Sequence, residues 1–125
     1  MEEKPDLELK ALNSYCGTQN YYQYMGVLFT DGVKYLMENG YSWFVTDAIA
    51  VIVAHPKIRQ HLQKDDFLTI KLKLNKDEDG YTTADMIITD GNDTQLYRQH
   101  YDLTDAKREL KLFYTGNVLM LASEY

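Results

Sequence analysis

The chain has little that would link it covalently or anchor it in a membrane. It contains one cysteine, Cys16, so no disulfide can form within the chain. A disulfide-stapled secreted scaffold is therefore excluded, and a reducing cytoplasm is expected. The acidic N-terminus lacks the apolar core of a signal peptide. The longest apolar region, residues 43–55, contains an aspartate and is too short to span a bilayer, so we expect a cytoplasmic protein with no membrane partner.

Positive charge is also scarce. The 125 residues include 13 Lys and Arg against 19 Asp and Glu, which gives a net charge of −6 and argues against direct binding to nucleic acid. The imbalance is uneven, because residues 57–76 contain six bases and two acids, whereas residues 77–105 contain eight acids and one base. Such a dipolar surface can steer a partner, although solvated loops produce the same counts.

Motifs for metal binding and covalent catalysis are missing. His55 and His61 lie six residues apart, which does not place them on one helix face, and His100 stands alone on an expected strand. Cys16 has no histidine nearby in the sequence, and the chain contains neither a GxSxG elbow nor a glycine-rich phosphate loop. We therefore expect no cofactor and no metal, and a binding protein rather than an enzyme.

Aromatic residues are what the chain has in excess. It contains 11 tyrosines, 4 phenylalanines and one tryptophan, together 13% of the residues. Tyrosine combines a large apolar ring with a polar end, so this enrichment suits a half-buried sheet and also a binding surface.

Helical patterns dominate the first 65 residues. They predict a short helix over residues 5–17, a second over 30–40 and an almost wholly apolar, buried third helix over 42–55. Thr30 and Ser42 are the expected N-caps, Asn39-Gly40 is a stop signal, and Pro56 ends or kinks the third helix. Residues 18–26 are ambiguous between strand and helix.

After Asp66 the apolar residues alternate with polar ones, which is typical of strands. The expected strands begin near residues 67, 81, 94, 110 and 118, with Asp90–Asp93 and Gly116-Asn117 as hairpin turns. Residues 1–125 are thus expected to form one α+β domain, in which N-terminal helices pack on one face of a C-terminal antiparallel meander of about five strands.

Two isolated aspartates mark the candidate polar site. Asp31 falls in a first helical turn, where the helix dipole stabilises a carboxylate. Asp47 lies one turn into the buried helix and must be paired or hydrogen-bonded there. The expected partners of Asp47 are Arg59, the amide end of the preceding helix, or the hydroxyl group of Tyr22, Tyr24 or Tyr41. The candidate site comprises Asp31, Asp47, Tyr22, Tyr24 and Trp43.

Three motifs carry a family resemblance. The stretch "FTDGVKYL", the stretch "SWFVTDAIA" and the ending "SEY" resemble the "YTDGVxYL", "YWLxDxIA" and "SEY" motifs of a bacterial family of unknown function. The resemblance implies no activity, substrate or cofactor. It marks Asp31, Gly32, Trp43 and Asp47 as the positions that match the motifs.

Three hypotheses about function follow. The first is a small acidic protein–protein interaction domain of bacterial or mobile-element origin, which binds another protein or itself as a homodimer. Its expected surface involves the tyrosines near Tyr21–Tyr24, Trp43 and the exposed face of the sheet. The second is a small-ligand-binding protein or enzyme with an Asp/Tyr site between the two central helices. The third is an acidic inhibitor that imitates nucleic acid and occupies a nucleic-acid-binding protein.

Overall fold

The computed structural model describes residues 18–102 and 104–125, so the helix predicted over residues 5–17 lies outside the described residues. Seven strands and three α-helices follow one another along this part of the chain. Their order and bounds are β1 Tyr21–Tyr24, β2 Val27–Thr30, α2 Asp31–Leu36, η1 Met37–Tyr41, α3 Ser42–Ala54, α4 Pro56–Leu62, β3 Phe67–Lys76, β4 Thr82–Thr89, β5 Gln95–Tyr101, β6 Leu110–Thr115, β7 Val118–Leu121 and η2 Ala122–Glu124.

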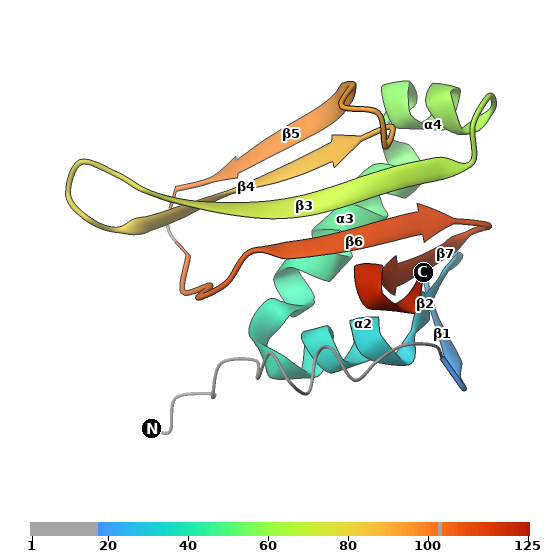
Figure 1. Cartoon of the computed structure of the whole chain (residues 1–125), viewed down its shortest axis with the longest axis horizontal. Helices are drawn as coiled ribbons and strands as arrows, with labels where there is room; N and C mark the ends of the chain where they lie inside the picture. Colours follow the sequence, from blue (N-terminus) through green and yellow to red (C-terminus); the bar gives the residue numbers. More distant parts are fainter. Residues whose placement is uncertain (1–17, 103) are drawn as a thin grey trace.

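The strands form one sheet in the order β1-β2-β7-β6-β3-β4-β5 (Figure 1). All neighbouring strands are antiparallel except β2 and β7, which run parallel and pair Leu28 with Val118 and Phe29 with Leu119. In the sheet, the neighbour of the β1-β2 hairpin is therefore β7, which comes last in sequence among the described strands.

The predicted α+β class is confirmed, but the simple five-stranded meander is wrong. Strand β6 pairs with the free edge of β3 instead of continuing beyond β5, because its apolar residues complete the same core face there. Two further strands, β1 and β2, come from the half expected to be mainly helical. Their two-residue turn, Met25-Gly26, has both φ angles positive (51° and 83°), which suits the twist of a tight hairpin.

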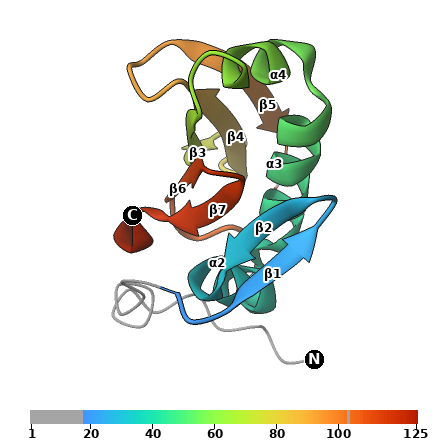
Figure 2. The same ribbon diagram turned by 90° about the vertical axis from the view of Figure 1, so that its right-hand side faces the viewer.

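Helices α3 and α4 cover one face of the sheet, and η2 and Tyr125 lie over part of the opposite face, which we call the open face (Figure 2). Helix α3 supplies five buried side chains to the core, namely Phe44, Val45, Ala48, Ile49 and Ile52. Alternate residues of the central strands meet them, as predicted: Leu68, Ile70 and Leu72 on β3, and Ala84, Met86 and Ile88 on β4, all 0% exposed. The predicted buried third helix is thereby confirmed.

Local signals explain where the helices begin and end. The Thr30 side chain accepts a hydrogen bond from the Val33 N–H, which confirms the predicted N-cap of α2. Gly40 has a φ of 99°, a value that suits glycine, and it separates α2 from α3. The predicted Ser42 cap is wrong, because Ser42 is already the first helical residue and Tyr41 before it makes no side-chain cap. Pro56 begins α4 directly after α3 ends.

Candidate functional site

Asp31 accepts hydrogen bonds from the segment that precedes β1. Its carboxylate accepts the N–H groups of Gln19 (3.1 Å) and Asn20 (3.3 Å) and the hydroxyl of Tyr22 (3.1 Å). The Asp31 N–H donates to the Thr18 hydroxyl at 2.9 Å. The Gln19 hydrogen bond is the largest influence on the pKa of Asp31, and together with those from Tyr22, Asn20 and Thr18 it lowers that pKa below its usual value, although desolvation acts in the opposite direction. The Asp31 carboxylate thus holds the segment before β1 against the start of α2.

Thr30 and Gly32, the residues on either side of Asp31, form hydrogen bonds with Glu124. The Thr30 hydroxyl donates to Glu124 at 2.6 Å, and the Gly32 N–H donates to the same carboxylate at 3.3 Å. The Leu121 N–H adds a third hydrogen bond at 2.9 Å. We call this group the Glu124 clasp. It joins the "TDG" and "SEY" stretches, 92 residues apart at Gly32 and Glu124, in one structural contact.

Asp47 has partners on β5. It accepts hydrogen bonds from the Tyr101 hydroxyl (2.8 Å) and the Gln99 amide (3.5 Å). Burial raises the pKa of Tyr101 and the hydrogen bond to Asp47 raises it further, so this phenol keeps its proton and remains a donor. Trp43 packs its ring edge-on against Tyr101 at a centroid distance of 4.9 Å. The group ties α3 to the edge strand of the sheet.

The five residues of the predicted polar site therefore occupy different places. Asp31 and Tyr22 lie together, Asp47 and Trp43 share Tyr101, and Tyr24 is 43% exposed on β1. Asp31 and Asp47 bond to different partners. Two hollows of the described surface lie elsewhere, both beside β3.

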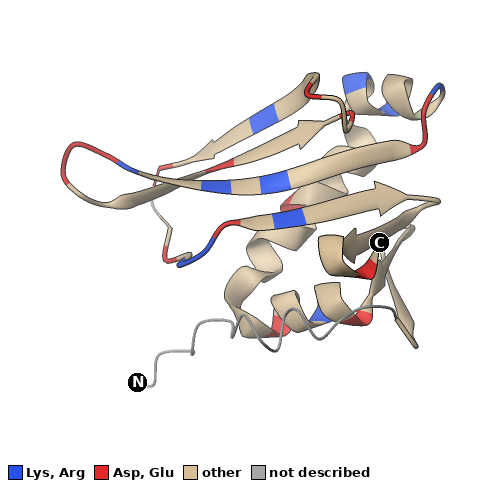
Figure 3. Cartoon of the chain, in the orientation of Figure 1, with Lys and Arg blue, Asp and Glu red and all other residues tan. Residues whose placement is uncertain are grey.

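A cluster of positive charge lies on the open face of the sheet. The strand register sets Lys71 and Lys73 of β3, Lys111 of β6 and Arg98 of β5 on the same side of the sheet. Figure 3, which views the side opposite α3, shows basic segments on these three strands. We call these four residues the basic face. The strand register sets Lys71 of β3 directly opposite Lys111 of β6. On the other side of Lys71 lies Ile87 of β4, and beyond it Arg98 of β5. Like charges that lie directly opposite each other on neighbouring strands, as Lys71 and Lys111 do, destabilise a sheet.

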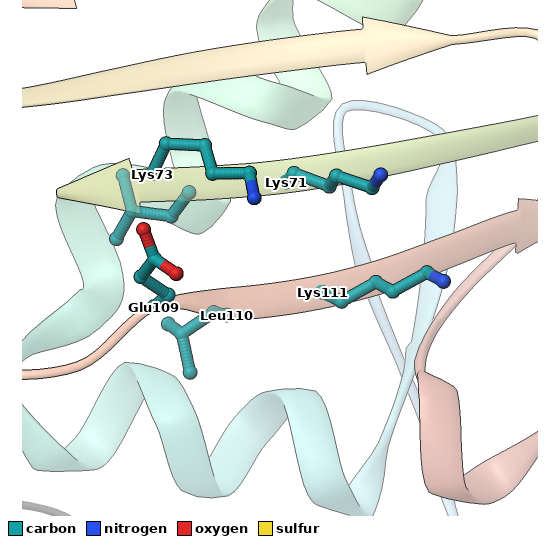
Figure 4. Close-up of a pocket in the computed structure, with 6 residues that line it drawn as sticks. Lys71, Lys73, Glu109, Leu110 and Lys111 are labelled. Carbon is teal, nitrogen blue, oxygen red and sulfur yellow. The ribbon is translucent and has the colours of Figure 1, made fainter. Parts of the chain in front are cut away.

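Within the described residues none of the three lysines forms an ion pair, although Asp85 lies directly opposite Lys73 on β4. In the described ranges the ion pairs involve only Asp85 with Arg98 and His100, and Asp102 with His100. Glu109 lies close to Lys73 in Figure 4, yet its carboxylate accepts the Leu74 N–H at 3.0 Å and forms no ion pair. The lysines line a shallow hollow of about 320 Å³ between β3 and β6. Local repulsion that brings no stability is typical of a functional surface.

Arg98 differs from the lysines because its charge is balanced. The Asp85 side chain is only 6% exposed and accepts hydrogen bonds from Arg98 (3.0 Å), His100 (2.9 Å) and Asn75 (3.3 Å). Burial acts to raise the pKa of Asp85, but the hydrogen bonds and charges of His100 and Arg98 outweigh it and leave the pKa lowered. The net positive charge of this face therefore belongs to the lysines.

An aromatic group adjoins the lysines. Phe67 on β3 and Phe113 on β6 lie 5.3 Å apart between ring centroids, and Tyr125 packs edge-on against both at 5.7 and 5.1 Å. The Lys111 ammonium lies 5.2 Å from the centroid of the Phe113 ring. Phe67 and Phe113 are half-buried, and Tyr125 is 71% exposed. The open face thus has a charged zone and an apolar zone side by side.

The sequence reasoning included the exposed sheet face in the expected interaction surface but singled out no basic residue on it. Alternation in "FLTIKLKL" placed Lys71 and Lys73 on the polar side of their strand, which is the available signal. Lys111 and Arg98 belong to separate segments, and only the β6-β3-β4-β5 order brings them together.

The fold is that of an α+β protein with helices on one face of a mostly antiparallel sheet and a charged, open opposite face. The chain belongs to a family of unknown function, DUF6876, whose model matches residues 6–125, and this confirms the resemblance to such a family. Comparisons with curated proteins and with solved structures give no match.

Two surveys of the described residues bear on the site. Within residues 18–102 and 104–125, no group of three or more His, Cys, Asp or Glu side chains is placed to hold a metal ion. None of the helices in that part of the chain has the length and apolar character needed to cross a membrane.

Proposed function

We propose that this chain is a protein–protein interaction domain whose basic face binds an acidic segment of a partner protein. The observation that carries the proposal is the direct opposition of Lys71 and Lys111 without a carboxylate within ion-pair distance among the described residues. A bound carboxylate between the two ammonium groups would relieve their repulsion. Relief of this repulsion would then contribute to the free energy of binding.

The surrounding charges favour a short acidic segment over a nucleic acid. The turn after β3 contains Asp77, Glu78 and Asp79, and the turn after β4, at the other end of the strands, contains Asp90 and Asp93. Figure 3 shows acidic residues at both ends of the strands. A polyphosphate chain that continued past the lysines would meet these acids, whereas a protein segment can place neutral or basic residues there.

The alternative of an Asp/Tyr reaction centre gains no support from the geometry. Asp47 and Tyr101 satisfy each other by a 2.8 Å hydrogen bond, and the raised pKa of Tyr101 makes it a poor acid. The pair is better suited to holding α3 on the sheet.

The expected affinity is modest. Each exposed ion pair contributes roughly 0.2–1 kcal/mol, so the lysines supply only part of the binding free energy. The apolar zone, formed by Phe67, Phe113 and Tyr125, supplies the rest. The ionic part is screened by salt, because the Debye length falls from about 10 Å at 0.1 M to about 3 Å at 1 M. Binding should therefore be transient and weaken as salt rises.

Fluorescence anisotropy with a labelled acidic peptide tests the proposal. Changing both Lys71 and Lys111 to Glu should weaken binding at least about tenfold, since two attractions become repulsions. The matched control changes Lys57 on α4 and Lys64, both exposed, to Glu, with the same change in net charge. Equal weakening by both pairs would show that only net charge matters and would refute the proposal.

A further inference from the structure

Side chains of the basic face and of the apolar zone recur at every second residue of the strands. Lys111 and Phe113 are separated by one residue on β6, so both side chains leave the same face about 7 Å apart. Lys73 and Lys71 have the same separation on β3. The surface therefore presents a cation, a second cation and an apolar ring at regular steps along the strand direction.

The register between β3 and β6 aligns these steps. Lys71 lies opposite Lys111 and Thr69 lies opposite Phe113, so the charged step and the apolar step each extend across both strands. Lys73 lies one step further along β3 than the lysine pair, beside Glu109 in Figure 4. It is also opposite Asp85, whose charge Arg98 balances. Phe67 and Tyr125 pack against Phe113 and enlarge the apolar end.

An extended peptide repeats with the same spacing, since its alternate side chains point to one side about 6.6–7 Å apart. We infer that the partner segment binds in extended form and contains carboxylates at two alternate positions followed, two residues later, by an aromatic or large aliphatic side chain. The first carboxylate meets Lys73, the second meets Lys71 and Lys111, and the apolar side chain rests against Phe113 and its neighbours. This inference rests on the proposed function and gives the partner its recognition pattern.

The intervening residues of such a segment point away from the sheet. They contribute little to recognition, so the pattern of alternate positions matters more than overall composition. A helical segment places residues four apart about 6 Å from one another along one side, so its side chains fall increasingly short of the 6.6–7 Å steps of the strands. An acidic helix is therefore a poorer partner than an extended strand.

The test compares two peptides of identical composition, each with two glutamates and one phenylalanine among glycine and serine residues. In the first, the three residues occupy alternate positions, and in the second the two glutamates are adjacent. The alternating peptide should bind at least about fivefold tighter to the full chain, because only it matches the spacing of the surface. Changing Phe113 to Thr should abolish this preference, while the Lys57→Glu control keeps it. The melting temperatures of both variants verify that they fold.

The outcomes separate the inference from the proposed function. Equal binding of the two peptides that still depends on Lys71 and Lys111 overturns the spacing pattern and leaves the acidic-partner proposal standing. Binding of neither peptide overturns both. Displacement of the alternating peptide by a short thymidine oligonucleotide at lower concentration than by free acidic peptide also overturns both, since the occupant would then be a nucleic acid.

Discussion

Gly32 offers the sharpest test of the packing argument. A Cβ atom built on Gly32 would lie 2.5 Å from Glu124 Oε1, 2.5 Å from Leu121 Cδ1 and 2.8 Å from Glu124 Cδ. Glu124 cannot move away freely, because its carboxylate accepts hydrogen bonds from Thr30, Leu121 and Gly32 itself. The substitution Gly32→Ala must therefore displace Leu121 or break the Glu124 clasp.

The cost follows from these contacts. Overpacking costs about 1–3 kcal/mol, and hydrogen bonds to a charged acceptor contribute about 1.5–3 kcal/mol each. Alanine recovers at most about 1 kcal/mol through its higher helix propensity. The free energy of unfolding of Gly32→Ala should thus fall by roughly 2–4 kcal/mol.

Urea unfolding followed by the fluorescence of Trp43, the only tryptophan, measures this loss. The double variant Gly32→Ala with Glu124→Ala should lose about 1 kcal/mol less than the sum of the single losses, because the truncated side chain no longer overlaps the new methyl group. The exposed Glu38→Ala serves as a control on the same helical segment. A Gly32→Ala variant within about 0.5 kcal/mol of wild type, or strictly additive losses, would refute the reasoning.

Three further substitutions test the other groups. The fold lowers the pKa of Asp85, so the stability that the ionised carboxylate contributes is present above the unfolded value of 3.8 and is lost as pH falls through the folded value. In urea melts, the difference in stability between wild type and Asp85→Asn should therefore be large at pH 7 and decrease toward pH 3. Tyr101→Phe removes the hydrogen bond to Asp47 and should lower stability by about 0.5–1.5 kcal/mol in thermal melts, whereas an unchanged melt would contradict the structural role. Lys111→Thr removes the repulsion with Lys71 and should raise stability by a few tenths of a kcal/mol while weakening peptide binding; lower stability would contradict the repulsion argument.

Much of the fold was accessible from local patterns. Alternation from Phe67 onward predicted the strands and their buried side, and Thr30 and Pro56 marked helix boundaries, because each of these signals acts over a few residues. The sheet order was not accessible. Whether β6 joins β5 or β3 depends on which edge completes the core, and no local pattern encodes that choice.

The candidate surface illustrates the same limit. Sequence reasoning focused on Asp31 and Asp47 because isolated carboxylates in apolar surroundings stand out, yet both have hydrogen-bonded partners in the fold. The partners of Asp47, Tyr101 and Gln99, lie more than fifty residues away. Of the predicted partners, Tyr22 donates to Asp31 and Arg59 donates to the Ile52 carbonyl group. Lys71 and Lys111 look ordinary on separate strands and become unusual only when paired.

The parallel pairing of β2 with β7 has a consequence for how the protein is made. Of the seven described strands, β7 is made after the other six, yet it fills an interior position between β2 and β6, so the sheet stays in two pieces until that strand is in place. Completion of the sheet must wait for contacts across about ninety residues, and such late, long-range closure slows folding. Loss of residues 118–121 would cut β1 and β2 off from the four remaining strands.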